Sequence, residues 1–240
     1  MTRILEVDGL AKEFTLYILG GKKIHALDGV SFHMEEGEIV GLTGHSGSGK
    51  STLMKCIYRT YLPTAGSIRM RNGEGEFLDL AAASEHKVLE LRRSEMTYCS
   101  QFLHAIPRVP ALEVVAEGLL ARRRGREEAF RAARQCFERL GLPEELWDAY
   151  PSTFSGGEQQ RINISRAILS KPRFLLVDEP TASLDLRTKD AVIDMLLELK
   201  NSGTSILLIT HDAHTLNRLA DRCLQLENGS IRQTLETVVS

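Results

Sequence analysis

A glycine-rich segment directly behind a short apolar run is the feature that most constrains this chain. Residues 39–43 form the apolar run, and residues 44–51 match the pattern G-x-x-x-x-G-K-[S/T], with a helix-like stretch after them. The glycines let the backbone turn its N–H groups inward around phosphate oxygens, and the positive end of the following helix adds to the attraction. The order strand, loop, helix therefore predicts a phosphate-binding loop in an α/β fold.

The residues of this loop are the first candidates for a nucleotide site. Lys50 is long enough to reach terminal phosphates, and the hydroxyl of Ser51 suits Mg²⁺. A plain Gly/Ser turn is the alternative, which the strand before the loop and the helix after it disfavour. We expect the loop and the next residue to bind ATP, although His45 fills a variable position without a specific role: Gly44, His45, Ser46, Gly47, Ser48, Gly49, Lys50, Ser51 and Thr52.

A second apolar run, residues 174–177, ends in the adjacent carboxylates Asp178 and Glu179. Successive residues of a strand point in opposite directions, so the two carboxylates can have separate tasks. Asp178 is the candidate metal ligand that holds the water shell of Mg²⁺, and Glu179 is the candidate general base for an attacking water. A solvated strand end is the alternative, which loses weight because a phosphate-binding loop precedes it.

The pattern of strands and helices predicts one domain over residues 1–240. Continuous apolar runs are typical of the central strands of a parallel sheet, and they occupy residues 39–43, 174–177 and 205–210. The remaining strand signals predict an antiparallel β subdomain, with strands at residues 4–7, 26–34 and 67–71 and hairpin turns at Asn72-Gly73 and Asn228-Gly229. Residues 102–166 have helical spacing, and we predict that they form a helical lobe inserted into a core made of residues 1–101 and 167–240.

Composition narrows the classes of partner. The formal net charge of -2 gives no basic field that would attract nucleic acid. No apolar stretch approaches the length of about 18 residues that spans a bilayer, so we expect no direct membrane insertion. The cysteines are scattered without a C-x-x-C pair, which favours reduced thiols in a cytoplasmic protein: Cys56, Cys99, Cys136 and Cys223.

A third candidate site is Ser155-Gly156-Gly157, just before a helical stretch. A serine at the cap position followed by two glycines leaves backbone N–H groups open at a helix start, where anions bind. An ordinary helix cap is the alternative reading of this segment.

Together these motifs resemble the ATP-binding cassette (ABC) ATPase family, because six features occur in the family's order. After the phosphate loop come Gln101, the signature at residues 155–157, the two carboxylates, Asp185 and His211. The resemblance implies an ATPase that holds Mg-ATP between two subunits, with Ser155, Gly156, Gly157 and Asp185 contacting nucleotide across the interface. It also implies that Gln101 senses the γ-phosphate and Mg²⁺ as a catalytic and metal-site residue, and that His211 contacts the γ-phosphate.

Two positions leave details of the family pattern open. The aromatic residue that stacks on adenine in the family is matched best by Phe14, with Tyr17 as the alternative and a plain core position as a third reading. The usual glutamine of the signature is Glu158, whose carboxylate is favourable at a helix start.

Finer resemblance concerns the process that the ATPase drives. Residues 61–68, 100–108 and 151–161 look like the L subunits of bacterial carbon-phosphorus lyase systems, which degrade phosphonates and are akin to lipoprotein-export and macrolide-export ATPases. The resemblance implies a second ABC subunit and the lyase core complex as partners, with the apolar residues 102–107 as a docking segment. The alternatives are an exporter subunit and an ATP-gated assembly switch with little turnover.

Overall fold

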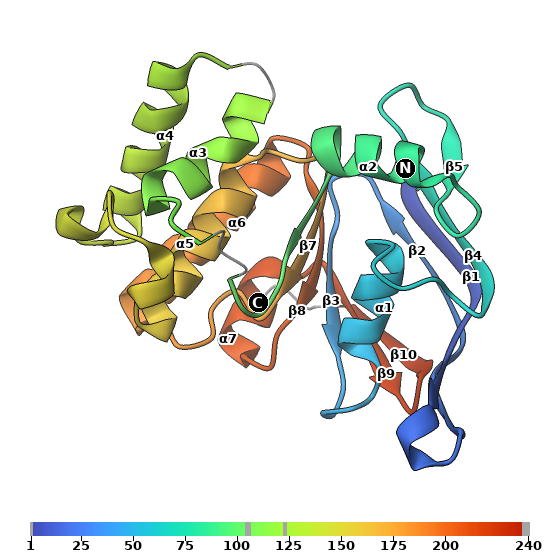
Figure 1. The fold of residues 1–240 in the computed structure, drawn as a ribbon. Coiled ribbons are helices and arrows are strands. Elements are labelled where there is room, and N and C mark those ends of the chain that lie inside the picture. The colour runs from blue at the N-terminus through green and yellow to red at the C-terminus, as the bar shows by residue number, and fades with distance from the viewer. Residues whose placement is uncertain (1, 104–106, 122–123, 237–240) are drawn as a thin grey trace.

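The computed structural model describes residues 2–103, 107–121 and 124–236. Within these residues, six strands form one sheet in the order β10-β9-β3-β8-β7-β6 (Figure 1). All neighbours pair in parallel except β9 and β10, so the predicted parallel core is confirmed. The strands are β3 (Ile39–Thr43), β6 (Met96–Cys99), β7 (Phe174–Asp178), β8 (Ser205–Ile209), β9 (Arg222–Glu227) and β10 (Ser230–Glu236).

A second sheet of four antiparallel strands has the order β2-β1-β4-β5. Its first hairpin is longer than the sequence predicts, because β1 and β2 continue past register shifts to a short 3-10 helix at Tyr17–Leu19. The alternation of apolar and polar residues is lost there, so the pattern alone could not follow the strands. The bounds are β1 (Arg3–Leu16), β2 (Lys22–Glu35), β4 (Ala65–Arg71) and β5 (Phe77–Asp79).

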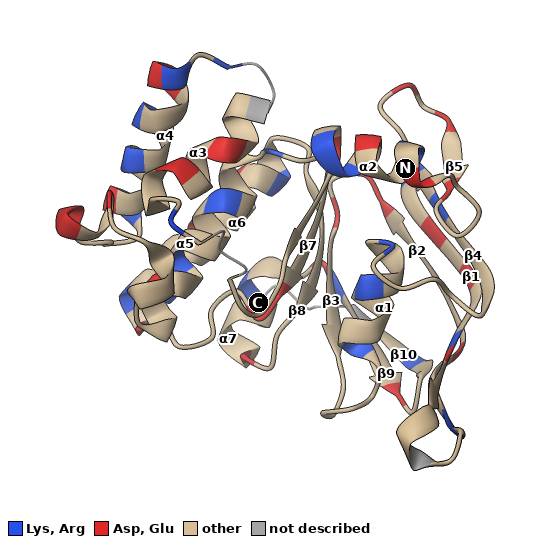
Figure 2. Ribbon diagram, in the orientation of Figure 1, with Lys and Arg blue, Asp and Glu red and all other residues tan. Residues whose placement is uncertain are grey.

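The helices cover the parallel sheet on both faces. Figure 1 shows α3, α4 and α5 together in a lobe on one side, and α1 on the other side of β3 and β7. Along α4, Figure 2 shows both basic and acidic residues, as expected for a solvated helix face. Among the described residues, none of the helices combines the length and the apolar character that a membrane span requires. The bounds are α1 (Lys50–Ile57), α2 (Glu85–Ser94), α3 (Ala111–Ala121), α4 (Arg126–Arg139), α5 (Gly156–Leu169), α6 (Leu186–Asn201) and α7 (Ala213–Leu219), with 3-10 turns at Glu144–Leu146 and Pro151–Thr153.

Strand β7 separates two hydrophobic cores, and this decides where its last residues point. Leu175 and Val177 pack into the core of the helical lobe, α5 and α6, whereas Phe174 and Leu176 pack into the core with α1 and the antiparallel sheet. Side chains two apart on a strand share a face. Asp178 therefore leaves the strand on the face of Leu176, toward α1 and the phosphate loop.

Candidate active site

The phosphate loop joins β3 to α1 through glycines that its surroundings require. Gly44 has φ +142°, and a Cβ there would collide with the carbonyl oxygen of Leu226 on β9. Gly49 has φ +107°, and its Cβ would lie 2.5 Å from the carbonyl oxygen of Ala26 on β2. Two neighbouring strands thus leave no room for a side chain at these positions, and only glycine adopts this backbone conformation without strain.

Lys50 is held inside this loop. Its Nζ donates hydrogen bonds to the carbonyl oxygens of Gly44 (2.7 Å) and His45 (2.9 Å). Burial lowers the pKa of Lys50, while the carboxylates of Glu179 and Asp178 oppose that shift. The hydroxyl of Ser48 is buried without a hydrogen-bond partner among the described residues. A buried amine and an orphaned hydroxyl in a loop of backbone N–H groups fit a polyphosphate.

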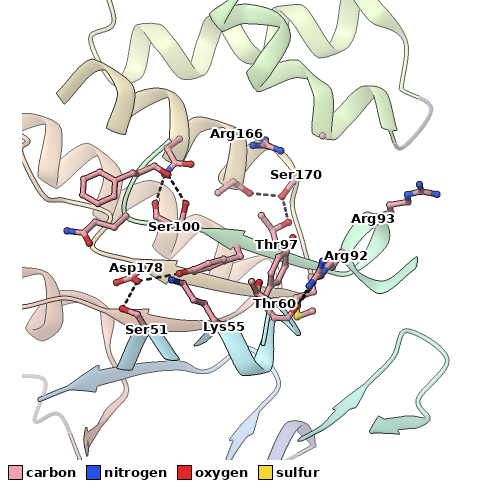
Figure 3. A pocket seen from close by; sticks show the side chains of 18 of the residues that line it. Ser51, Lys55, Thr60, Arg92, Arg93, Thr97, Ser100, Arg166, Ser170 and Asp178 are labelled. Atoms are coloured by element: carbon pink, nitrogen blue, oxygen red, sulfur yellow. Dashed lines mark hydrogen bonds between the residues drawn. The ribbon is translucent and has the colours of Figure 1, made fainter. Parts of the chain in front are cut away.

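Ser51 and Asp178 converge as the candidate metal ligands. The Ser51 hydroxyl donates a hydrogen bond of 3.0 Å to Oδ2 of Asp178, although the two residues are far apart in the sequence (Figure 3). A hydroxyl and a carboxylate are hard oxygen ligands of the kind that Mg²⁺ prefers. The residues present therefore fit Mg²⁺, which supplies positive charge against the terminal phosphates when bound.

Glu179 lies beside this pair in a strained backbone conformation with φ +53°. Its backbone oxygen accepts a hydrogen bond from Nε2 of Gln160 at 3.0 Å, a residue of α5 that the sequence did not single out. Its Oε1 is buried with no hydrogen-bond partner in the part of the chain that the structure describes, and it lies 3.7 Å from Nε2 of His211. Burial raises the pKa of Glu179. An orphaned carboxylate oxygen with a raised pKa is suited to accept a proton from water.

The signature serine caps α5. Its hydroxyl accepts a hydrogen bond from the backbone N–H of Glu158, and the Glu158 carboxylate accepts one of 2.8 Å from the N–H of Ser155. Hydrogen bonds of the Glu158 carboxylate with the side chain and with the backbone N–H of Ser155 lower the pKa of Glu158. Ser155 and Gly156 are both exposed, and a Cβ on Gly156 would meet nothing within 4 Å. The start of α5 is therefore well formed but is left open by its own chain.

The remaining predicted site residues surround these elements. Asp185 caps α6 through Thr188, with its Oδ1 accepting from the backbone N–H at 3.0 Å. Gln101 is exposed and lines a cleft of about 750 Å³ together with Ser51 and Asp178. Phe14 is half-buried and packs edge-on against Tyr61, with ring centroids 5.2 Å apart. The adenine contact stays a prediction for Phe14, as do the roles of Gln101 and Asp185.

The comparisons with known proteins agree with this geometry. The family pattern described as ABC transporter matches residues 27–182, which include the phosphate loop, the signature and both carboxylates. This chain belongs to the ABC transporter family. It is therefore an ATPase of the ABC cassette type, with ATP and Mg²⁺ as cofactors, and ABC ATPases act as dimers.

Two curated relatives in the ABC family are similar over nearly the whole chain. The lipoprotein-releasing system ATP-binding protein LolD of Bordetella pertussis is 34% identical over 95% of both chains. The macrolide export ATP-binding/permease protein MacB of Wolinella succinogenes is 35% identical over 98% of this chain, but this chain spans only 35% of that protein. The similarity thus covers one whole relative and the cassette part of a larger one.

Solved ABC cassettes have the same fold. A dimeric post-hydrolysis state of the cassette MJ0796 bound to ADP and Pi superposes with a TM-score of 0.87 and 28% identity, and covers 98% of this chain and 99% of that one. A second dimeric structure of MJ0796 gives a TM-score of 0.88 at the same identity. The predicted ABC-type α/β fold is confirmed. The boundaries of the helical lobe at residues 102 and 166 stay a prediction, and α5 runs past the second one to Leu169.

Proposed function

We propose that this chain is the ATP-hydrolysing subunit of an export-type membrane system, of the class to which the lipoprotein-releasing and macrolide-export relatives belong. The observation that carries the proposal is the match to LolD, which extends over 95% of both chains. In the proposed system, a partner permease supplies the membrane part. In this interpretation the chain works on the cytoplasmic side of the membrane.

Two cassettes enclose each ATP in the proposed working state. The phosphate loop and Asp178 of one subunit hold the nucleotide, and the open start of α5 of the other, with Ser155 and Gly157, closes over the γ-phosphate. The exposure of Ser155 and the empty space around Gly156 support this arrangement, because an N-terminal helix end with free N–H groups attracts an anion. The second cassette is either a copy of this chain or another ABC subunit. Recovered activity on mixing two inactive variants of this chain would show that a copy suffices.

The permease is proposed to dock at the cleft beside Gln101. Phe102 is 71% exposed at this cleft, which is a large apolar surface for a loop residue. Arg92 and Arg93 in the last turn of α2 and Arg166 of α5 lie on the same cleft (Figure 3). Ile106, which we also expected in the docking segment, lies outside the described residues.

The carbon-phosphorus lyase system is the second candidate. The three stretches at residues 61–68, 100–108 and 151–161 favour it. Tyr61 and residues 100–102 line the cleft, and the third stretch contains the signature. In that case the same cleft would dock on a soluble enzyme complex. The assembly switch with little turnover has less support, because Oε1 of Glu179 is buried without a hydrogen-bond partner among the described residues, which favours a general base.

Co-purification from cells that express the chain natively tests the proposal. Tagged protein is isolated from membrane and soluble fractions, and its partners are identified by mass spectrometry. We expect a permease in detergent extracts of the membrane fraction, and we expect Phe102→Asp to release it. Phe77→Asp is the matched control, because Phe77 is a 43% exposed phenylalanine on β5, away from the cleft lining.

The partner that is recovered decides between the candidates. Soluble subunits of a phosphonate-degrading enzyme in place of a permease would overturn the exporter assignment and support the lyase system. Equal retention of the permease by the Phe102 and Phe77 variants would show that the cleft is not the docking surface. Nucleotide binding by the Phe102 variant serves as the check that the cassette itself is intact.

A further inference from the structure

Asp178 accepts a second hydrogen bond that the sequence motifs do not include. The hydroxyl of Tyr98 donates to Oδ2 of Asp178 at 3.4 Å, the same oxygen that accepts from Ser51 at 3.0 Å. Figure 3 shows the Ser51 and Asp178 side chains facing each other in the cleft. Asp178 is only 5% exposed, so these donors replace water around a buried carboxylate.

Two donors on one oxygen restrict how the carboxylate can rotate. The terminal torsion of aspartate has broad minima, so a carboxylate without fixed donors samples a range of orientations. The Tyr98 contact thus favours the fixed orientation that a metal ligand needs.

The fold delivers Tyr98 to this position by strand register. Strand β6 pairs in parallel with β7, and Tyr98 stands opposite Leu176, two residues before Asp178 on the same face. The ring of Tyr98 packs against the ring of Tyr58 with centroids 5.4 Å apart. Arg92 lies 4.3 Å above Tyr58 and donates from Nε to the Tyr58 backbone oxygen at 3.0 Å. The aromatic pair is therefore fixed from the side of α2.

We infer that Tyr98 is a positioning residue of the metal site, whose hydroxyl holds the Asp178 carboxylate in the orientation that binds Mg²⁺. Outer partners that orient a metal-binding carboxylate typically change metal affinity by tenfold or more when removed. The inference rests on the ATPase site of this chain and is independent of the partner that the chain drives.

Metal binding in a hydrolysis-deficient background provides the test. Mn²⁺, as a spectroscopic substitute for Mg²⁺, is titrated into Glu179→Gln protein loaded with ATP, and free Mn²⁺ is read by electron paramagnetic resonance. Adding Tyr98→Phe is expected to raise the Kd of Mn²⁺ about tenfold, because the hydroxyl that orients the Asp178 carboxylate is lost. The Kd of ATP measured in EDTA should stay unchanged, because the hydroxyl acts on the carboxylate and not on the phosphate loop.

Tyr58→Phe in the same background is the matched control. It removes a hydroxyl from the ring next to Tyr98, and the backbone oxygen that binds Arg92 remains. We expect this control to bind Mn²⁺ like the Glu179→Gln parent. An unchanged Kd of Mn²⁺ in the Tyr98 variant would overturn the inference. The inference would also be overturned if the Tyr98 variant lost ATP affinity in EDTA by the same factor as Mn²⁺ affinity, or if its thermal unfolding midpoint fell. Either result would show that the hydroxyl stabilises the fold and does not specifically orient Asp178.

Discussion

The phosphate loop and the start of α5 both place glycines at a helix N-terminus, but the loop is packed against its own chain and the start of α5 is not. The loop is enclosed by its own chain, with Leu226 on one side and Ala26 on the other. The start of α5 has a complete capping box, but a side chain on Gly156 would meet empty space. In the proposed dimer, each chain thus supplies the phosphate loop as the enclosed wall of one nucleotide site and the start of α5 as the open wall of the other.

The same comparison separates two reasons for a glycine. Gly44 is required by crowding within the chain and by its positive φ, so its replacement harms folding itself. Gly156 has ordinary helical surroundings with room for a side chain, so its own chain does not require glycine there. Variants of the two walls should therefore differ in whether they lower stability or only turnover.

The largest effect on ATP turnover is expected at Glu179, the candidate general base. Glu179→Gln keeps the size of the side chain but cannot accept the proton, so ATP turnover should fall at least about a hundredfold. ATP binding measured by calorimetry should persist. Glu198→Gln, at a surface carboxylate paired with Arg139, is the control and should keep parental turnover. Parental turnover by the Glu179 variant would show that another group is the base.

The next effect tests the enclosure of the loop. Gly44→Ala places a Cβ against the Leu226 carbonyl at a positive φ, and the free energy of unfolding should fall by about 3 kcal/mol. Gly47→Ala is the matched control: its φ is also positive, at +80°, but a Cβ there meets nothing within 4 Å, so strain alone should cost about 1 to 2 kcal/mol. Denaturant unfolding without nucleotide measures both. Equal losses of unfolding free energy in the two variants would mean that steric contact with the surrounding strands does not require glycine at position 44.

A smaller effect on turnover, without loss of stability, is expected at the open wall. Gly156→Ala adds a methyl group on the surface where the other subunit's nucleotide would lie, and turnover should fall about tenfold through misplacement. The free energy of unfolding should stay the same or rise by up to about 1 kcal/mol, because alanine has a higher helix propensity than glycine. A variant that loses stability as well as turnover would contradict the comparison, since its own chain would then need this glycine.

The sequence predicted the elements whose signal is local. Residues 39–51 carry strand, loop and helix start in one stretch, and the Asn228-Gly229 turn between β9 and β10 is where the hairpin signal puts it. The contacts of Tyr98 with Asp178 and of Gln160 with Glu179 join residues 80 and 19 positions apart. Such contacts depend on strand register and helix packing, which no local pattern encodes.

The finer assignment to carbon-phosphorus lyase shows a different limit. It rests on short stretches around the cleft and the signature, whereas the two curated relatives described above belong to a lipoprotein-releasing system and a macrolide exporter. A cassette carries its own chemistry in its motifs, but the surface that selects a partner has few constraints of charge or spacing. Phe102 and the arginines of the cleft indicate where a partner would bind, but they do not identify the partner.

Mixing two inactive variants tests the shared site most directly. Lys50→Ala removes the lysine of the phosphate loop, and Ser155→Arg places a large side chain at the start of α5. Neither variant alone should therefore hydrolyse ATP. In an equal mixture about half of the dimers are mixed and each has one intact site of two, so about a quarter of the parental rate should return. No recovery in a preparation where crosslinking demonstrates mixed dimers would contradict the account, because either the two walls do not act on one nucleotide across the interface or one intact site does not suffice for turnover.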